Sequence, residues 1–178
     1  MVWVKSDFIS NEFHNNPISL VAMLEPKQDP LKVKDISHRL RVQDYLSGFT
    51  YNSHIWIFWK DGISVYLLSM SEQFINLNFS VAENPYILSV VYDKCDAEAR
   101  ISLWEDLSSF IPGDFPWLVG GDFNIMPSST EKKGCGPFPR GNGQDFMAFM
   151  GNNGLLDAGF SGDPFTWGNN QRGNCYSS

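Results

Sequence analysis

Short apolar runs and one helical repeat fill the first quarter of the chain. Residues 18–24 are almost continuously apolar, which predicts a buried strand, and it should end before Pro26 because proline has no amide hydrogen to donate. Residues 31–42 repeat their apolar positions at helical spacing and predict an amphipathic helix. A shorter helix is predicted at residues 5–15, before an Asn-Asn-Pro break.

The middle of the chain predicts a meander of mostly antiparallel strands. Four β-like segments follow one another, at residues 55–59, 63–69, 74–79 and 85–92. The first is apolar throughout, the third alternates apolar and polar positions, and an Asp-Gly turn signal separates the first two.

The last third of the chain alternates helices with one more strand. A helix is predicted to begin after Asp96, which is a suitable N-cap residue, and to end by Pro112. Residues 117–121 predict an apolar strand that leads into a turn, and residues 144–152 predict a second helix. Helices placed between strands, around a strand meander, predict a mixed α/β or α+β sandwich.

Composition favours one globular domain. The chain has 178 residues, of which 43% are hydrophobic and 19% are charged, so it is too apolar for a disordered chain and short for two domains. We therefore expect residues 1–178 to form a single domain. The formal net charge of −7 argues against a protein that coats nucleic acid, but not against a nuclease whose metal site needs carboxylates.

Neither cysteine spacing nor apolar runs indicate export. Cys95, Cys135 and Cys175 have neither the spacing of a zinc site nor the pattern of a disulfide framework, so reduced thiols without disulfide partners are expected. No signal-peptide pattern is seen at the N-terminus, and the longest apolar runs are too short to span a bilayer. These features predict an intracellular protein, nuclear or cytoplasmic, with no membrane partner.

The sequence Gly120-Gly121-Asp122-Phe123-Asn124 carries the sharpest chemical signal. It directly follows an apolar strand, and two glycines allow the backbone to turn tightly and approach a ligand. Asp122 and Asn124 lie two residues apart, so both side chains can face one cleft, where a carboxylate holds a cation or activates water. An ordinary Asx-turn explains the same residues, and spacing alone modestly favours that reading.

Two further polar residues follow strand ends. Glu25 ends the first apolar run and suits Mg²⁺, which prefers one or two carboxylates together with waters and phosphates. Tyr92 ends another run and carries a hydroxyl that can donate to a phosphate. Taken singly, Glu25 reads as a solvent-facing residue and Tyr92 as a packing residue. If the strands lie side by side, however, both converge with Asp122 on one sheet edge, as a magnesium phosphodiesterase site requires.

Three segments resemble, in order, the motifs of the endonuclease/exonuclease/phosphatase family. They are residues 20–27 with Glu25, residues 89–95 with Tyr92, and residues 119–124 with Asp122. The sequences of these three segments look closest to those of the endonuclease domains of plant LINE-type (non-LTR) retrotransposons. Residues 154–167 also resemble a stretch typical of those elements.

The resemblance implies a DNase I-like, four-layered α/β sandwich, with two sheets face to face and helices outside. It implies Mg²⁺ or Mn²⁺ held chiefly by Glu25, with Asp122 as a second metal-site residue that activates or orients the attacking water. It further implies that Asn124 assists at the phosphate and that Tyr92 contacts the scissile phosphate. The partner implied is target-site DNA, which retrotransposon members nick to prime reverse transcription.

The chain also departs from the family pattern. It lacks the asparagine of an early Trp-Asn motif, and it lacks the late aspartate and the Ser-Asp-His motif. Its histidines, His14, His38 and His54, lie in no such motif and read as surface or packing residues. We therefore expect an incomplete, poorly stable domain with weak or no activity. The alternatives are a non-catalytic remnant of the fold and a phosphatase-like relative that acts on a small or lipid phosphate.

Contacts to a DNA backbone can only be nominated from the positions of basic residues. The candidates are Lys94, Arg100, Lys132, Lys133 and Arg140. Lys132 and Lys133 fall in a loop rich in glycine and proline, for which a solvated loop is the better reading.

Overall fold

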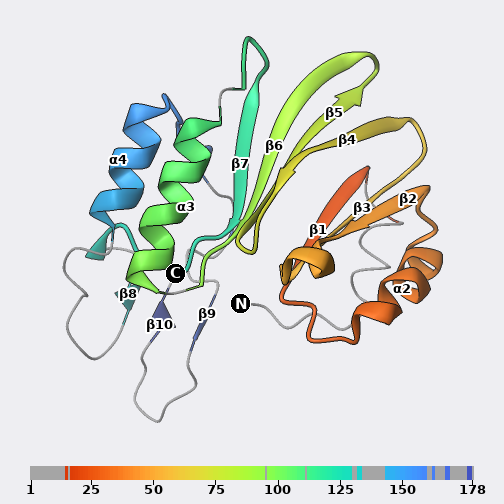
Figure 1. Ribbon diagram of the computed structural model, residues 1–178, viewed down its shortest axis with the longest axis horizontal. Coiled ribbons are helices and arrows are strands. Elements are labelled where there is room, and N and C mark those ends of the chain that lie inside the picture. Colours follow the sequence, from red (N-terminus) through yellow and green to blue (C-terminus); the bar gives the residue numbers. More distant parts are fainter. Residues whose placement is uncertain are drawn as a thin grey trace. The chain divides into compact units, whose positions relative to one another are not determined.

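The computed structural model describes residues 15, 17–94, 96–110, 112–129, 132–133, 143–159, 162, 167–168 and 176–177. These residues divide between two compact units, which are labelled by element in Figure 1. The sheet unit is drawn from Val4–Lys94 and Ile111–Phe123, and the helix unit from Cys95–Phe110 and Asn124–Ser178. The prediction of a single domain stays a prediction.

The sheet unit contains two β-sheets. The first sheet is antiparallel and has the order β1 (Leu20–Leu24), β3 (Ile55–Trp59), β2 (Asp44–Ser47). The second has the order β4 (Ile63–Met70), β5 (Phe74–Val81), β6 (Asn84–Tyr92), β7 (Trp117–Asp122). Its first three strands form an antiparallel meander, whereas β7 pairs with β6 in parallel. Parallel pairing needs a crossover connection, and the chain between these two strands includes a helix.

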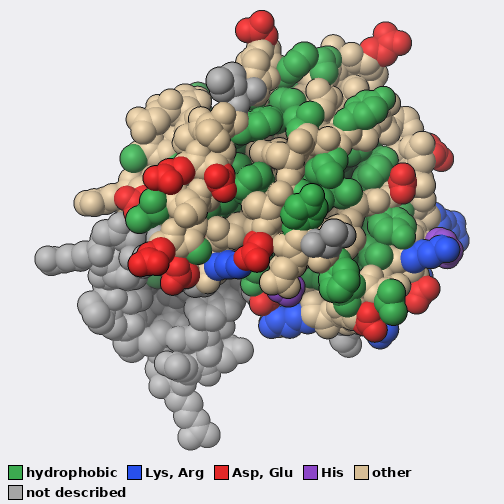
Figure 2. All heavy atoms as spheres, in the orientation of Figure 1, with side chains coloured by type: hydrophobic (Ala, Val, Ile, Leu, Met, Phe, Trp, Pro, Cys, Tyr) green, Lys and Arg blue, Asp and Glu red, His purple; other side chains and the backbone are tan. Residues whose placement is uncertain are grey.

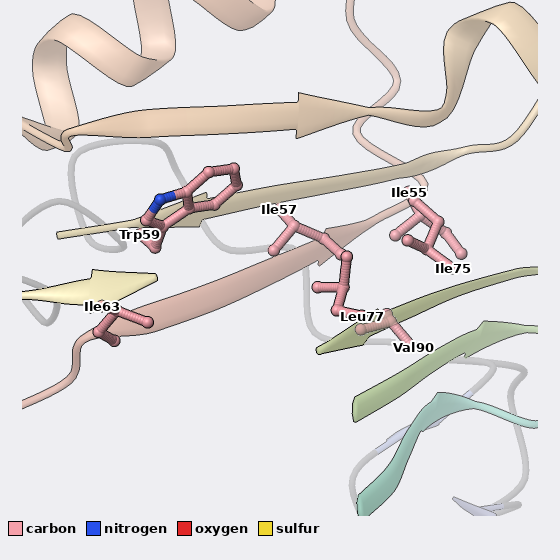
Figure 3. Close-up of a cluster of buried hydrophobic side chains, with 7 residues drawn as sticks. All are labelled: Ile55, Ile57, Trp59, Ile63, Ile75, Leu77 and Val90. Atoms are coloured by element: carbon pink, nitrogen blue, oxygen red, sulfur yellow. The ribbon is translucent and has the colours of Figure 1, made fainter. Parts of the chain in front are cut away.

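Strand β3 is buried on both faces, which explains its uninterrupted apolar sequence. Ile55, Ile57 and Trp59 face the second sheet, where they form one cluster with Ile63, Ile75, Leu77 and Val90. Figure 3 shows these seven side chains gathered between strands of the two sheets. The main core of the sheet unit therefore lies between two sheets that pack face to face.

Helix α2 (Val33–Leu40) covers the other face of the first sheet. Its apolar residues Val33, Ile36 and Leu40 form a second cluster with Trp56 and Phe58 of β3. A 3-10 turn, η1 (Pro30–Lys32), precedes the helix, and the Asp29 carboxylate caps this turn by accepting from the Leu31 amide at 2.9 Å. A second 3-10 turn, η2 (Gly48–Tyr51), joins β2 to the segment that leads into β3.

A line of side-chain hydrogen bonds crosses the second sheet. Asn76 on β5 donates to the Ser69 hydroxyl on β4 at 2.9 Å and accepts from the Ser89 hydroxyl on β6 at 2.6 Å. The Trp117 indole on β7 in turn donates to the Ser89 oxygen at 2.8 Å. Since Asn76 and Ser89 are almost fully buried, these bonds satisfy polar groups that would otherwise destabilise the sheet.

The helix unit pairs two helices and three short strands. Helix α3 (Ala97–Ser109) begins at Asp96, whose carboxylate accepts from the Ala99 amide at 2.9 Å. Helix α4 (Gln144–Asn152) packs against α3 through Phe149, whose ring stacks on Trp104 with centroids 4.8 Å apart. The small antiparallel sheet has the order β8 (Lys132–Lys133), β10 (Tyr176–Ser177), β9 (Trp167–Gly168).

Most predicted elements are confirmed, and the main correction concerns the meander. The segment at residues 55–59 was predicted to join it, but β3 pairs with β1 and β2 in a separate sheet. Strand β2 was missed because its four residues have little apolar periodicity. The predicted helix at residues 5–15 lies almost entirely outside the described residues, and so do the three cysteines.

Candidate functional site

One pocket of the sheet unit joins two of the three strand-end residues singled out from the sequence. It has a volume of about 290 Å³ and is lined by residues from both sheets and from the turn η2. Its polar lining residues include Glu25, Lys27, Asn52, Ser53, His54 and Tyr92. We call this cavity the Glu25 pocket.

Glu25 is held in place by backbone contacts at the end of β1. Its amide donates to the His54 carbonyl at 2.8 Å, which extends the β1–β3 ladder by one residue. Glu25 and Lys27 have positive φ values of 50° and 42°, on either side of Pro26. Residues other than glycine rarely adopt this region, at a cost of about 1–3 kcal/mol each, and such strain concentrates at functional sites.

The Glu25 carboxylate is only partly satisfied by the protein. Its Oε2 atom is buried and has no hydrogen-bond partner among the described residues. The Lys27 ammonium lies 3.6 Å from this oxygen, and the two side chains are 50% and 23% exposed, respectively. A buried carboxylate oxygen without a hydrogen bond is costly, so the pocket suits a further partner at this atom. The solvent-facing reading of Glu25 is therefore wrong for this oxygen.

Tyr92 reaches the same pocket from the second sheet. It is the last residue of β6, and its amide donates to the Gln73 carbonyl at 2.8 Å. The Tyr92 ring meets the His54 ring edge to face, with centroids 6.2 Å apart and an interplanar angle of 78°. His54 comes immediately before β3, so this contact ties the two sheets together at the pocket.

Asp122 lies beside Tyr92 at the ends of two neighbouring strands. The two residues are register partners in the parallel β6–β7 pair, and the Asp93 amide donates to the Asp122 carbonyl at 2.9 Å. Asp122 is half-buried and is the last residue of β7. The predicted convergence of Tyr92 and Asp122 on one sheet edge is confirmed.

The two glycines before Asp122 differ in the space around them. Gly121 has a φ of 150°, and a Cβ atom there would lie 1.9 Å from the Val91 carbonyl oxygen on β6. A Cβ at Gly120 would meet nothing within 4 Å. Gly121 is thus required for the close approach of β7 to β6, and this approach sets the position of Asp122. The predicted approach of this turn to a ligand stays a prediction.

The convergence of Glu25 with Tyr92 also needs a correction. The strands were expected to lie side by side, but β1 belongs to the first sheet and β6 to the second. The two residues meet in one pocket because the sheets pack face to face, which places strand ends from different sheets close together.

His54 is a pocket residue that sequence reasoning missed. The sequence around it matches no recognised motif and predicts only a surface or packing residue. Antiparallel pairing of Leu24 with Ile55 places the residue before Ile55 opposite Glu25. The sequence does contain a signal for this position of His54. The two longest apolar runs, residues 18–24 and 55–59, pair as neighbouring strands, and this pairing brings His54 next to Glu25.

Of the residues that the structure describes, Asn124 and the basic residues proposed to contact DNA do not line the Glu25 pocket. Asn124 is exposed, has a φ of 48° and is the first residue of its stretch of the helix unit. Lys94 forms an ion pair with Glu72. Lys132 and Lys133 form β8, but their side chains are outside the described residues, as is Arg140.

The pocket offers one carboxylate to a cation, that of Glu25, whose Oε2 atom also lies 3.6 Å from the Lys27 ammonium. Across the described residues, no group of three or more His, Cys, Asp or Glu side chains is arranged to hold a metal. Mg²⁺ does not need such a cluster, because it keeps several waters and binds through one or two carboxylates and substrate phosphates. The buried Glu25 Oε2 offers one such ligand.

Comparison with known proteins identifies the fold. No family profile and no curated protein matches the sequence. Among solved structures, the chain is similar to the crystal structure of beta toxin 275-280 from Staphylococcus aureus, with a TM-score of 0.61 and 15% identity. The match covers 91% of this chain and 67% of the toxin chain. The chain therefore has a mixed α/β fold of the DNase I-like type, as predicted. None of the described helices is long and apolar enough to cross a membrane.

Proposed function

We propose that this chain is a divalent-metal-dependent phosphodiesterase that cleaves DNA, of the kind found in plant non-LTR retrotransposons. The observation that carries the proposal is the buried Glu25 Oε2, which has no hydrogen-bond partner among the described residues and lines a pocket with Tyr92. The DNase I-like fold is compatible with this chemistry, and the resemblance of the motifs to those of plant retrotransposon endonucleases favours DNA as the substrate.

Each strand-end residue then has a distinct role. Glu25 would hold Mg²⁺ or Mn²⁺, and a bound cation of this type supplies Lewis-acid stabilisation to a phosphoryl oxygen. Asp122 would orient the attacking water and accept its proton, while Asn124 assists at the phosphate. Tyr92 would donate its hydroxyl hydrogen to the scissile phosphate. In the overall hydrolysis, water adds to phosphorus, one P–O ester bond breaks, and the leaving oxygen gains a proton.

Charge indicates how DNA would be held. The chain has a net charge of −7, and the Lys and Arg side chains visible in Figure 2 are few. Nonspecific affinity for DNA depends on phosphate neutralisation, so we expect weak, salt-sensitive binding. Recognition would then depend on the metal and the pocket rather than on a basic surface.

A specific observation supports a second candidate, a phosphoester with an apolar group such as a lipid phosphate. A neighbouring cavity of about 470 Å³ shares Pro30 and Phe49 with the Glu25 pocket. Its apolar residues are unusually exposed, at 84% for Leu31 and 63% for Phe49. An apolar wall next to a phosphate pocket suits such a substrate.

Plasmid nicking tests the proposed function directly. If the site is active, purified chain with Mg²⁺ is expected to convert supercoiled plasmid slowly to open circles, and EDTA, Glu25→Gln and Asp122→Ala should each abolish the nicking. Far-UV circular dichroism of every variant controls for folding. Nicking that persists in both variants would place the activity in another site or in a contaminant.

Parallel assays separate the remaining readings. Phospholipid vesicles and a chromogenic phosphodiester are incubated with the same preparations of protein. Hydrolysis of phospholipid without nicking of plasmid would favour the second candidate. A folded protein that hydrolyses none of these substrates would favour the reading of a non-catalytic relative that keeps only the fold.

A further inference from the structure

A serine next to His54 shares an unusual property with Glu25. Ser53 is 5% exposed and lines the Glu25 pocket, and its hydroxyl oxygen is buried without a hydrogen-bond partner among the described residues. A buried hydroxyl normally finds a partner, because leaving it unsatisfied destabilises the folded protein. Two such oxygens in one pocket, at Ser53 and Glu25, indicate a site built for a ligand.

The local backbone fixes Ser53 in this position. The Ser53 amide donates to the Gly48 carbonyl at 3.0 Å, which closes the turn η2. A Cβ atom at Gly48 would lie 2.5 Å from the Ser53 Cβ, so the turn closes only because Gly48 has no side chain. Asn52 precedes Ser53 with a φ of 54°, a left-handed conformation that asparagine tolerates better than most residues. The serine is therefore held in the pocket wall by a tightly closed turn.

His54 is held in the same wall but remains accessible. Its carbonyl accepts from the Glu25 amide at 2.8 Å, and its ring packs edge to face on Tyr92. The residue is nevertheless exposed and lines the pocket, so its ring nitrogens are available to a ligand. The main chain and one ring contact thus orient the imidazole in the pocket lining.

We propose that Ser53 and His54 form a phosphate-binding wall of the Glu25 pocket, with the Ser53 hydroxyl and the His54 imidazole donating hydrogen bonds to phosphate oxygens. This inference rests on the proposed function, because it assigns the substrate-binding side of the same site. A hydroxyl and an imidazole N–H are both donors, which suits an oxyanion, whereas the carboxylate of Glu25 suits the cation. Lys27 also lines the pocket, where its ammonium lies 3.6 Å from the Glu25 Oε2 atom.

Binding of inorganic phosphate measures this wall without requiring catalysis. The Glu25→Gln variant in EDTA removes both the proposed metal ligand and its negative charge, and it is the background for the titration. Phosphate binding is followed by chemical-shift changes of the Ser53 and His54 amides. Adding Ser53→Ala or His54→Ala should weaken binding by about tenfold or more each, because a hydrogen bond to a charged group is lost.

Two further variants make the assignment specific. His38→Ala removes an exposed histidine on α2, outside the pocket, and should leave phosphate binding unchanged. His54→Arg keeps a hydrogen-bond donor at this position and should restore much of the affinity that His54→Ala loses. Ser53→Ala in the otherwise unchanged protein should melt at the same or a higher temperature, because it removes a buried hydroxyl that lacks a partner among the described residues.

The opposite results would overturn the inference. If phosphate affinity survives both Ser53→Ala and His54→Ala, these residues do not bind phosphate. The same conclusion follows if the Glu25→Gln protein is folded but binds no phosphate. Weaker Mg²⁺ binding in Ser53→Ala, with phosphate binding intact, would reassign Ser53 as a metal ligand. Failure of the proposed function appears separately, as loss of plasmid nicking by the unmodified chain.

Discussion

At the residue scale, the site is made by side chains that the backbone holds in uncommon conformations. Glu25 and Lys27 have positive φ, and Gly121 has a φ that side chains rarely adopt. Glu25 directly follows β1, Lys27 lies three residues beyond the end of β1, and Gly121 is the second-last residue of β7. Such strain persists only where surrounding contacts determine the conformation, and here those contacts are the β1–β3 and β6–β7 ladders.

Replacing Gly121 with alanine should strongly destabilise the protein, whereas the same change at Gly120 should not. The added Cβ would lie 1.9 Å from the Val91 carbonyl oxygen at Gly121, but would meet nothing within 4 Å at Gly120. We expect a loss of about 3 kcal/mol or more for Gly121→Ala and less than about 1 kcal/mol for Gly120→Ala. Urea unfolding of both variants checks this, and equal losses would contradict the close approach of β7 to β6.

At the element scale, the burial pattern of each strand explains its sequence. Strand β3 is apolar at every position because α2 covers one face and the second sheet the other. Strand β5 alternates less strictly, and its buried Asn76 is tolerated because Ser69 and Ser89 provide hydrogen-bond partners on both sides. The side-chain hydrogen bonds that join β4, β5, β6 and β7 therefore help to align these strands. They contribute to the register that brings Asp122 beside Tyr92.

Removing the side-chain amide of Asn76 should destabilise the protein more than removing that of Asn78, which lies on the same strand. Asn76 is 1% exposed and bonds to two serines, so Asn76→Ala leaves both serine hydroxyls short of a partner. We expect a loss of about 2–4 kcal/mol in the free energy of unfolding. Asn78→Ala on the same strand, where the side chain is only half-buried, should cost about 1 kcal/mol or less.

Chemical denaturation of both asparagine variants, followed by intrinsic tryptophan fluorescence, measures the difference. A loss at Asn76 no larger than that at Asn78 would mean that the side-chain hydrogen bonds of Asn76 do not stabilise the sheet.

At the scale of the whole molecule, the sheet unit creates the pocket by packing two sheets against each other. Glu25 and His54 come from the first sheet and its flanking turn, and Tyr92 from the second. Stability of the pocket therefore depends on the core between the sheets. A ligand that binds only the folded pocket should stabilise the whole sheet unit by mass action.

Magnesium should raise the melting temperature of the protein through Glu25. A cation that binds only the native state stabilises it by about 2.7 kcal/mol at a concentration one hundred times its dissociation constant. We expect an upward shift with increasing Mg²⁺ that disappears in Glu25→Gln. Thermal unfolding at constant ionic strength measures it, with Na⁺ replacing Mg²⁺ as the control. An equal shift in the variant would locate the stabilising cation elsewhere.

The sequence by itself determined the elements and the positions of the candidate residues along them. The strand at β1, the helices α2 and α4, and the strand ends at Glu25, Tyr92 and Asp122 follow from apolar periodicity and from turn residues. These are local properties, since periodicity records which face of each element is buried.

Only the tertiary structure decided how those strands are shared between sheets. It separated β3 from the meander, placed Glu25 and Tyr92 in one pocket from opposite sheets, and brought Ser53 and His54 into it. Strand pairing joins residues far apart in the chain, and one apolar run can pair with any of several others. The physical reason is that register and partner are fixed by the packing of all the strands together, which no single segment encodes.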